Sequence, residues 1–92
     1  MHDGLLWLLG GRENWNHWRR RKNRINLSGV SLARVNLSGY DLRGVNFEGA
    51  NLRGAVLREA CMDRALLSGA DLSRADLTGA KGRYMFHRST SH

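Results

Sequence analysis

The chain has 92 residues, of which 25% are charged and 41% hydrophobic, with a formal net charge of +7 and one cysteine, Cys61. This length indicates one domain with a small core. A single cysteine excludes an internal disulfide framework and favours a reducing compartment, so we expect a cytoplasmic protein. No apolar run approaches the roughly 18 residues of a membrane span, and residues 4–11 (GLLWLLGG) lack the basic leader and cleavage site of a secretory signal.

Residues 1–24 are the first predicted segment, a helical cap. Leu5, Leu8, Trp15 and Trp18 fall on one helical face, and the two consecutive glycines between these pairs are expected to break the helix into two pieces. Each tryptophan buries about 150–250 Å², which suits the covering of a flat apolar surface. The less favoured alternative is an aromatic platform for nucleic-acid bases.

An unbroken basic run follows the tryptophans. Cations are stabilised near the C-terminus of a helix, so the favoured interpretation is a solvated helix end. The alternative is a patch that contacts the phosphates of nucleic acid or anionic lipid, for which four residues are a short run. The run consists of Arg19, Arg20, Arg21 and Lys22.

Residues 25–79 are eleven consecutive five-residue units, each with a large apolar third residue. A spacing of five moves successive side chains about 500° around a helix, and a strand requires a period of two, so the chain must instead turn a corner in every unit. Seven units end in glycine, which suits a tight turn with positive φ. We expect a different turn type at the other four corners, which end in Arg34, Glu59, Arg64 and Arg74. The Asn or Asp found second in seven units is expected to hydrogen-bond to nearby backbone.

These units resemble the pentapeptide repeat family, whose motif is A(D/N)LXX, and WNHWR at residues 15–19 is similar to the WNxWR helix that precedes the repeats in bacterial members. The resemblance implies an all-β solenoid, a right-handed quadrilateral β-helix with four units per coil. The eleven units would then form about 2.75 coils, in a β-helix domain that spans residues 25–83. The N-terminal α-helical cap would cover the first coil, whose backbone would otherwise offer an edge for pairing.

In such a coil, residues twenty apart stack, and the third residues fill the lumen in four inner columns. Gly82 occupies the place of the next apolar residue, so regular winding is expected to end near Ala80. The predicted structural core consists of Leu27, Leu32, Leu37, Leu42, Phe47, Leu52, Leu57, Met62, Leu67, Leu72 and Leu77.

The flanks carry the net charge, because the repeats hold six Arg and six acidic residues. Within the repeats, Arg34, Arg53 and Arg74 fall on one wall and make it basic. Together with the N-terminal run, they are the candidate basic surface. Family members that protect DNA gyrase resemble DNA through a long acidic rod, and this chain differs from them in charge and length.

Residues 84–92 are the predicted C-terminal cap and tail, in which Tyr84, Met85 and Phe86 fold back over the last coil. Three residues are a thin cover for a whole coil end. We therefore expect that this end packs against the same end of a second copy, giving a homodimer, or continues into a longer array.

The sequence predicts no catalytic, cofactor or metal site. A lumen filled with apolar side chains offers no cleft for catalytic groups, and the four histidines lie outside the repeats at spacings that match no metal motif. We expect a non-enzymatic, rigid scaffold that binds another protein. The alternative is binding of nucleic acid or an anionic surface through the basic flanks. A topoisomerase modulator and the terminal module of a larger signalling protein are less favoured.

Overall fold

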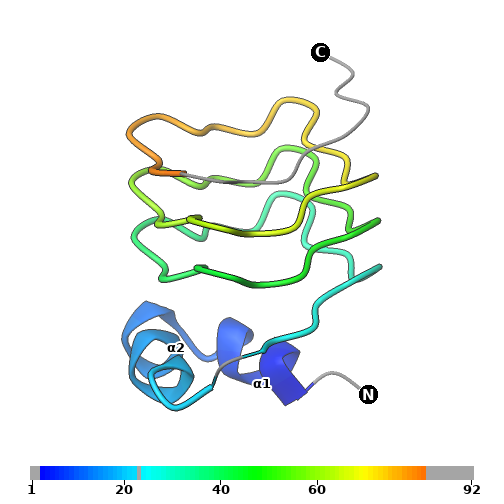
Figure 1. The fold of residues 1–92 in the computed structure, drawn as a ribbon. Helices are drawn as coiled ribbons and strands as arrows, with labels where there is room; N and C mark the ends of the chain where they lie inside the picture. The colour runs from blue at the N-terminus through cyan, green and yellow to red at the C-terminus, as the bar shows by residue number, and fades with distance from the viewer. Residues whose placement is uncertain (1–2, 23, 83–92) are drawn as a thin grey trace.

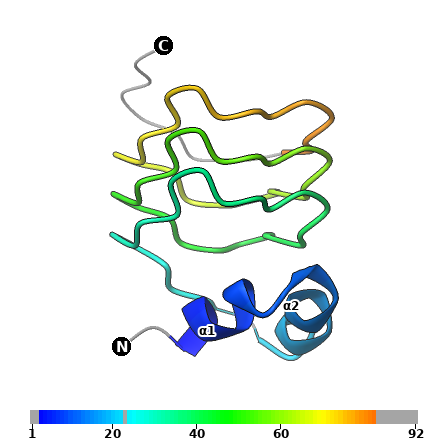
Figure 2. The same ribbon diagram turned by 180° about the vertical axis from the view of Figure 1, so that it is seen from behind.

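Two short helices lie at one end of a stack of coils (Figures 1 and 2). The structure is a computed structural model that describes residues 3–22 and 24–82. Helix α1 spans Asp3–Leu9 and helix α2 spans Arg12–Arg19. Gly11, between them, has φ of 111°, a conformation that residues with a side chain rarely adopt. The predicted break at the glycine pair is confirmed.

The coils pair through single parallel bridges between residues twenty positions apart, beginning with Asn26 and Asn46 and ending with Cys61 and Lys81. Each coil therefore has four sides of five residues. We name the stacked sides wall 1 (units beginning at residues 25, 45 and 65), wall 2 (30, 50 and 70), wall 3 (35, 55 and 75) and wall 4 (40 and 60, with Lys81 continuing the ladder).

Every corner from the unit beginning at Ile25 to the one beginning at Ala75 is the same kind of turn. At the first corner the Val30 amide donates to the Leu27 carbonyl over 3.3 Å, and Gly29 between them has φ of 70°. The fourth residue of each unit keeps a negative φ, which makes these type II turns. The prediction of a different turn at Arg34, Glu59, Arg64 and Arg74 is wrong, because these residues have φ of 60–64°, close to the glycine values. The repeating inter-coil hydrogen bonds impose the same corner on both kinds of residue.

The polar second residue of each unit fixes the turn that follows it. Asn46 Oδ1, for example, accepts from the Glu48 amide over 2.8 Å, and Asp71 Oδ1 accepts from the Ser73 amide over 3.0 Å. The same contact, to the residue two positions on, occurs at all seven Asn and Asp residues in this position. The prediction of local side-chain to backbone bonds is confirmed.

The third residues of the units point into the lumen, together with the first residues, most of which are smaller. From Leu27 to Leu67 all nine third residues are buried, and Leu8 and Trp15 of the helices join the same core. The last described coil differs, since Leu72 is partly buried and Leu77 is 42% exposed. The predicted C-terminal lid and tail lie outside the described residues.

Candidate functional site

Helix α2 is fastened to the first coil at wall 4 by the side chains of its WNHWR segment. Trp15 Nε1 donates to the Asp41 carbonyl over 2.7 Å. Asn16 makes two bonds, accepting from the Asp41 amide over 2.8 Å and donating to the Gly39 carbonyl over 3.2 Å. The backbone groups of Asp41 thus face the helix. Those of its neighbours pair with the next coil: the Leu42 amide donates to the Cys61 carbonyl, and the Tyr40 carbonyl accepts from the Cys61 amide. These bonds therefore occupy backbone groups of Gly39 and Asp41 that do not pair with the second coil.

Arg19 completes this contact, and its position corrects the predicted basic surface. Its guanidinium donates to the Arg43 carbonyl over 2.6 Å and lies 3.4 Å from an Asp41 carboxylate oxygen. Only 7% of the residue is exposed. A helix residue four positions after Trp15 lies on the same face, so Arg19 points at the coil while the remainder of the run is exposed.

Asp41 links the helix to the coil electrostatically. Partial burial alone would raise the pKa of its carboxyl, but hydrogen bonds from Arg43 and the charges of Arg19 and Arg43 outweigh burial and hold that pKa below its ordinary value. The Arg43 guanidinium contacts both carboxylate oxygens, at 2.7 Å each. The carboxylate is thus stabilised in its charged form between the two arginines.

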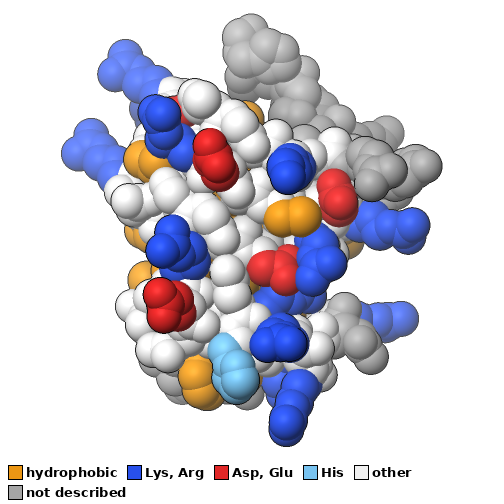
Figure 3. All heavy atoms as spheres, turned by 90° about the vertical axis from the view of Figure 1, so that its left-hand side faces the viewer, with side chains coloured by type: hydrophobic (Ala, Val, Ile, Leu, Met, Phe, Trp, Pro, Cys, Tyr) orange, Lys and Arg blue, Asp and Glu red, His pale blue; other side chains and the backbone are white. Residues whose placement is uncertain are grey.

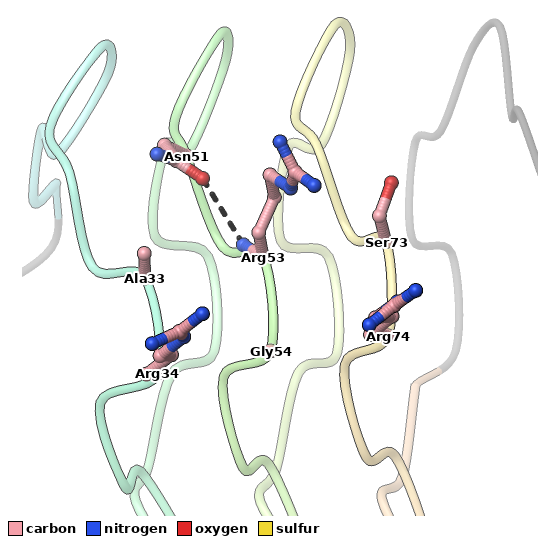
Figure 4. Close-up of a pocket in the computed structure, with 7 residues that line it drawn as sticks. All are labelled: Ala33, Arg34, Asn51, Arg53, Gly54, Ser73 and Arg74. Atoms are coloured by element: carbon pink, nitrogen blue, oxygen red, sulfur yellow. Dashed lines mark hydrogen bonds between the residues drawn. The ribbon is translucent and has the colours of Figure 1, made fainter.

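Wall 2 brings Arg34, Arg53 and Arg74 together from three successive coils, as Figure 4 shows. They line a shallow pocket of about 460 Å³ with Asn51, Ser73 and two small residues. All three arginine side chains are exposed. The sequence-based grouping therefore corresponds to one continuous surface.

The arginines of wall 2 differ from those of the other walls in their partners. Arg43 and Arg58 pair with Asp41 and Asp76 on their own walls at 2.7 and 3.2 Å. Arg53 has only a long contact of 3.9 Å to Asp71. Across residues 3–22 and 24–82, Arg34 and Arg74 have no ion pair and no side-chain hydrogen bond. Wall 2 therefore carries two uncompensated positive charges.

Gly54 makes room for this arrangement. It lies between Arg34 and Arg74 in the corner column (Figure 4), and a Cβ at this position would lie 3.2 Å from Arg34 Cγ. Because Gly54 has no Cβ, the Arg34 side chain can lie along the corner. The pocket is thus shaped by the corner residues of three coils.

The described part of the chain holds neither a candidate metal site nor a candidate membrane span. Residues 3–22 and 24–82 contain no group of three or more His, Cys, Asp or Glu residues placed to hold a metal ion. No helix within these ranges is both long and apolar enough to cross a membrane.

The model of the family described as pentapeptide repeats matches eight copies over residues 23–59 and 50–81. This chain belongs to the pentapeptide repeat family. Proteins of the family form right-handed quadrilateral β-helices, in agreement with the four-sided coils described above.

Solved structures of other pentapeptide repeat proteins resemble the chain. The pentapeptide repeat protein Rfr23 from the cyanobacterium Cyanothece 51142 is 36% identical, with a TM-score of 0.66 over 67% of this chain and 43% of its own. This chain thus spans less than half the length of that relative. The pentapeptide repeat protein alr5209 from Nostoc Pcc 7120 is 30% identical over 75% of each chain, with a TM-score of 0.30. A search of curated proteins gave no match.

Reasoning from the sequence identified the tryptophans of this pentapeptide repeat chain but missed their polar neighbours. Asn16 and Arg19 contribute as directly as Trp15 to the contact with wall 4. The WNxWR pattern contained the signal, since it pairs each tryptophan with a polar residue next to it. The pattern does not indicate, however, in which direction the Arg19 side chain points.

Proposed function

We propose that this chain is a non-enzymatic, rigid scaffold whose wall 2 binds an acidic segment of a partner protein. The observation that supports the proposal most directly is the pair of unpaired cations, Arg34 and Arg74, on one flat wall. Arginine side chains form paired hydrogen bonds with carboxylates and need little reorganisation on a rigid support.

The backbone at these two corners adds to the argument. Arg34 and Arg74 have φ of 64° and 60°, a region in which a residue with a side chain costs about 1 kcal/mol or more relative to glycine. Seven other corners use glycine with the same geometry. An arginine that makes no ion pair and no side-chain hydrogen bond with the described residues gains little to offset this cost, so a role in binding is the better explanation.

We further propose that helices α1 and α2 act as the N-terminal cap of the solenoid. The bonds from Trp15, Asn16 and Arg19 to wall 4 support this role, because they occupy backbone groups that another chain could pair with. A blocked end would direct binding to the walls. We place the scaffold in the cytoplasm, which the free thiol of Cys61 supports.

Replacing both corner arginines by glycine separates binding from folding. The Arg34→Gly/Arg74→Gly variant keeps a residue type that suits these corners, so its unfolding free energy should stay the same or rise by about 1 kcal/mol. Its affinity for a fluorescein-labelled polyglutamate peptide should fall by about 2- to 30-fold, from about 0.2–1 kcal/mol per exposed charge pair. Fluorescence anisotropy at low salt measures the affinity, and urea denaturation measures the stability.

The matched control removes two positive charges from positions outside wall 2. Arg20→Ser/Arg58→Ser lowers the net charge equally but leaves wall 2 intact, and it should bind the peptide nearly as the unmodified chain does. Equal losses in the two double variants would show that only net charge matters, and the proposal for wall 2 would be withdrawn.

A further inference from the structure

Trp7 is a large aromatic residue that the packing of the helices onto the coil leaves exposed. Trp15 is fully buried, whereas 43% of Trp7 is exposed. The Trp7 indole stacks on the Trp18 indole, with ring centroids 5.5 Å apart and planes inclined by 10°. Stacking covers one face of Trp7, and the rest of the exposed ring has no role in the core.

Cationic side chains adjoin this aromatic pair. Trp7, His17, Trp18, Arg21 and Lys22 line a pocket of about 330 Å³, and the Lys22 ammonium lies 5.4 Å from the centre of the Trp18 ring. Arg21 and Lys22 are exposed, and within the described ranges neither has an ion pair. Figure 3 shows basic side chains gathered beside a histidine at the helical end of one face.

We propose that this pocket binds single-stranded nucleic acid, with a base stacked on Trp7 and the adjoining phosphates held by Arg21 and Lys22. Flat aromatic rings beside cations are the combination that single strands require, since every base has a face that can stack. This site lies on the helices and does not involve wall 2, so it is independent of the protein-binding role proposed above.

The distribution of exposed apolar residues argues against a lipid surface as the ligand. Among the helix side chains that the structure describes, which leave out that of Leu6, the other large exposed apolar one is Leu9, at 60% exposure. It lies two positions after Trp7, which is about 200° around helix α1. Insertion into a membrane interface needs a continuous apolar face, and Trp7 and Leu9 point in different directions.

The test measures binding of a fluorescein-labelled oligothymidylate of about ten nucleotides by anisotropy. The full chain carrying Arg34→Gly/Arg74→Gly is used, so that wall 2 does not contribute. Trp7→Leu keeps the apolar bulk but removes the flat ring, and it should weaken binding by about 5- to 100-fold. Trp7→Phe, which restores a ring, should regain most of the affinity, and Leu9→Ala on the same helix should bind as the parent does.

Salt dependence tests the cations separately. Binding should weaken between about 50 and about 200 mM salt, and Arg21→Ala should reduce the slope of log K against log salt by about 0.7. Thermal unfolding of each variant checks that the helices remain docked.

The proposal is overturned if the parent does not bind the oligonucleotide at low salt or if Trp7→Leu binds it unchanged. It is also overturned if Leu9→Ala loses as much affinity as Trp7→Leu while both variants lose binding to phosphatidylserine-containing vesicles, because the surface would then be a lipid site. Failure of this test leaves the polyglutamate result at wall 2 unaffected.

Discussion

The two ends of the described solenoid treat the same motif position differently. In the wall 3 column, Leu37 and Leu57 are fully buried, whereas Leu77 in the third coil is 42% exposed. The N-terminal end has Leu8 and Trp15 packed into the core and hydrogen bonds from helix α2 along wall 4. The difference shows that the same motif position is buried to different degrees along the tube, since Leu67 in the third coil is still buried while Leu77 is exposed. Burial in a solenoid is a property of neighbouring coils, more than of the repeat itself.

The largest expected effect on stability comes from comparing the same substitution, leucine to alanine, in the middle of the tube and at its end. Leu52→Ala should lower the unfolding free energy by about 2–5 kcal/mol, because it empties a fully enclosed site. Leu77→Ala removes the same atoms from a partly exposed site and should cost under about 1 kcal/mol. Urea denaturation gives both values, with Arg53→Ala as the exposed neighbour expected to cost under about 0.5 kcal/mol. Similar losses for both leucines would contradict the comparison.

A smaller effect tests how the N-terminal end is closed. Asn16→Ala leaves the Asp41 amide and the Gly39 carbonyl without their helix partner, and should cost about 1–3 kcal/mol. Asn14→Ala, on the same helix, removes a single exposed bond to the Gly10 carbonyl and should cost under about 0.5 kcal/mol. Thermal unfolding followed by circular dichroism compares the two. An Asn16→Ala variant as stable as the unmodified chain would show that the Asn16 bonds are not needed to hold the helices on the coil.

The smallest effect is a change in pH dependence at the same contact. The folded-state pKa of Asp41 lies below the ordinary value of 3.8, so its contribution to stability is present above that pH and is lost as the pH falls through the folded pKa. Asp41→Asn should therefore be less stable than the unmodified chain near neutral pH, and the gap should narrow as the pH falls below about 4.

Urea denaturation over a series of pH values measures that gap. Glu48→Gln is the matched control, because Glu48 lies in the same region of the solenoid and has no ion pair with the described residues. Its stability curve should run parallel to that of the unmodified chain. A constant gap for Asp41→Asn across the same range would mean that the carboxylate charge does not stabilise the helix contact.

Much of the solenoid could be predicted because its repeat is local. A period of five with one large apolar residue predicts both the corners and the inward side chains, and the Asn and Asp residues predict their own turn bonds. The turn at Arg34 and the other non-glycine corners was mispredicted for the opposite reason. There the hydrogen bonds to a neighbouring coil, which the residue types do not reveal, override the preference of the residue.

The candidate sites divide in the same way. The sequence by itself determined the five-residue period, the family resemblance and the alignment of Arg34, Arg53 and Arg74 on one wall, because residues twenty apart must stack once the coil has four sides. Only the tertiary structure decided that Arg19 turns inward, that Asn16 occupies the edge of wall 4 and that Trp7 remains exposed beside Trp18. Those outcomes depend on the angle at which two short helices meet the first coil. That angle is set by packing between segments distant in sequence, which a local pattern does not encode.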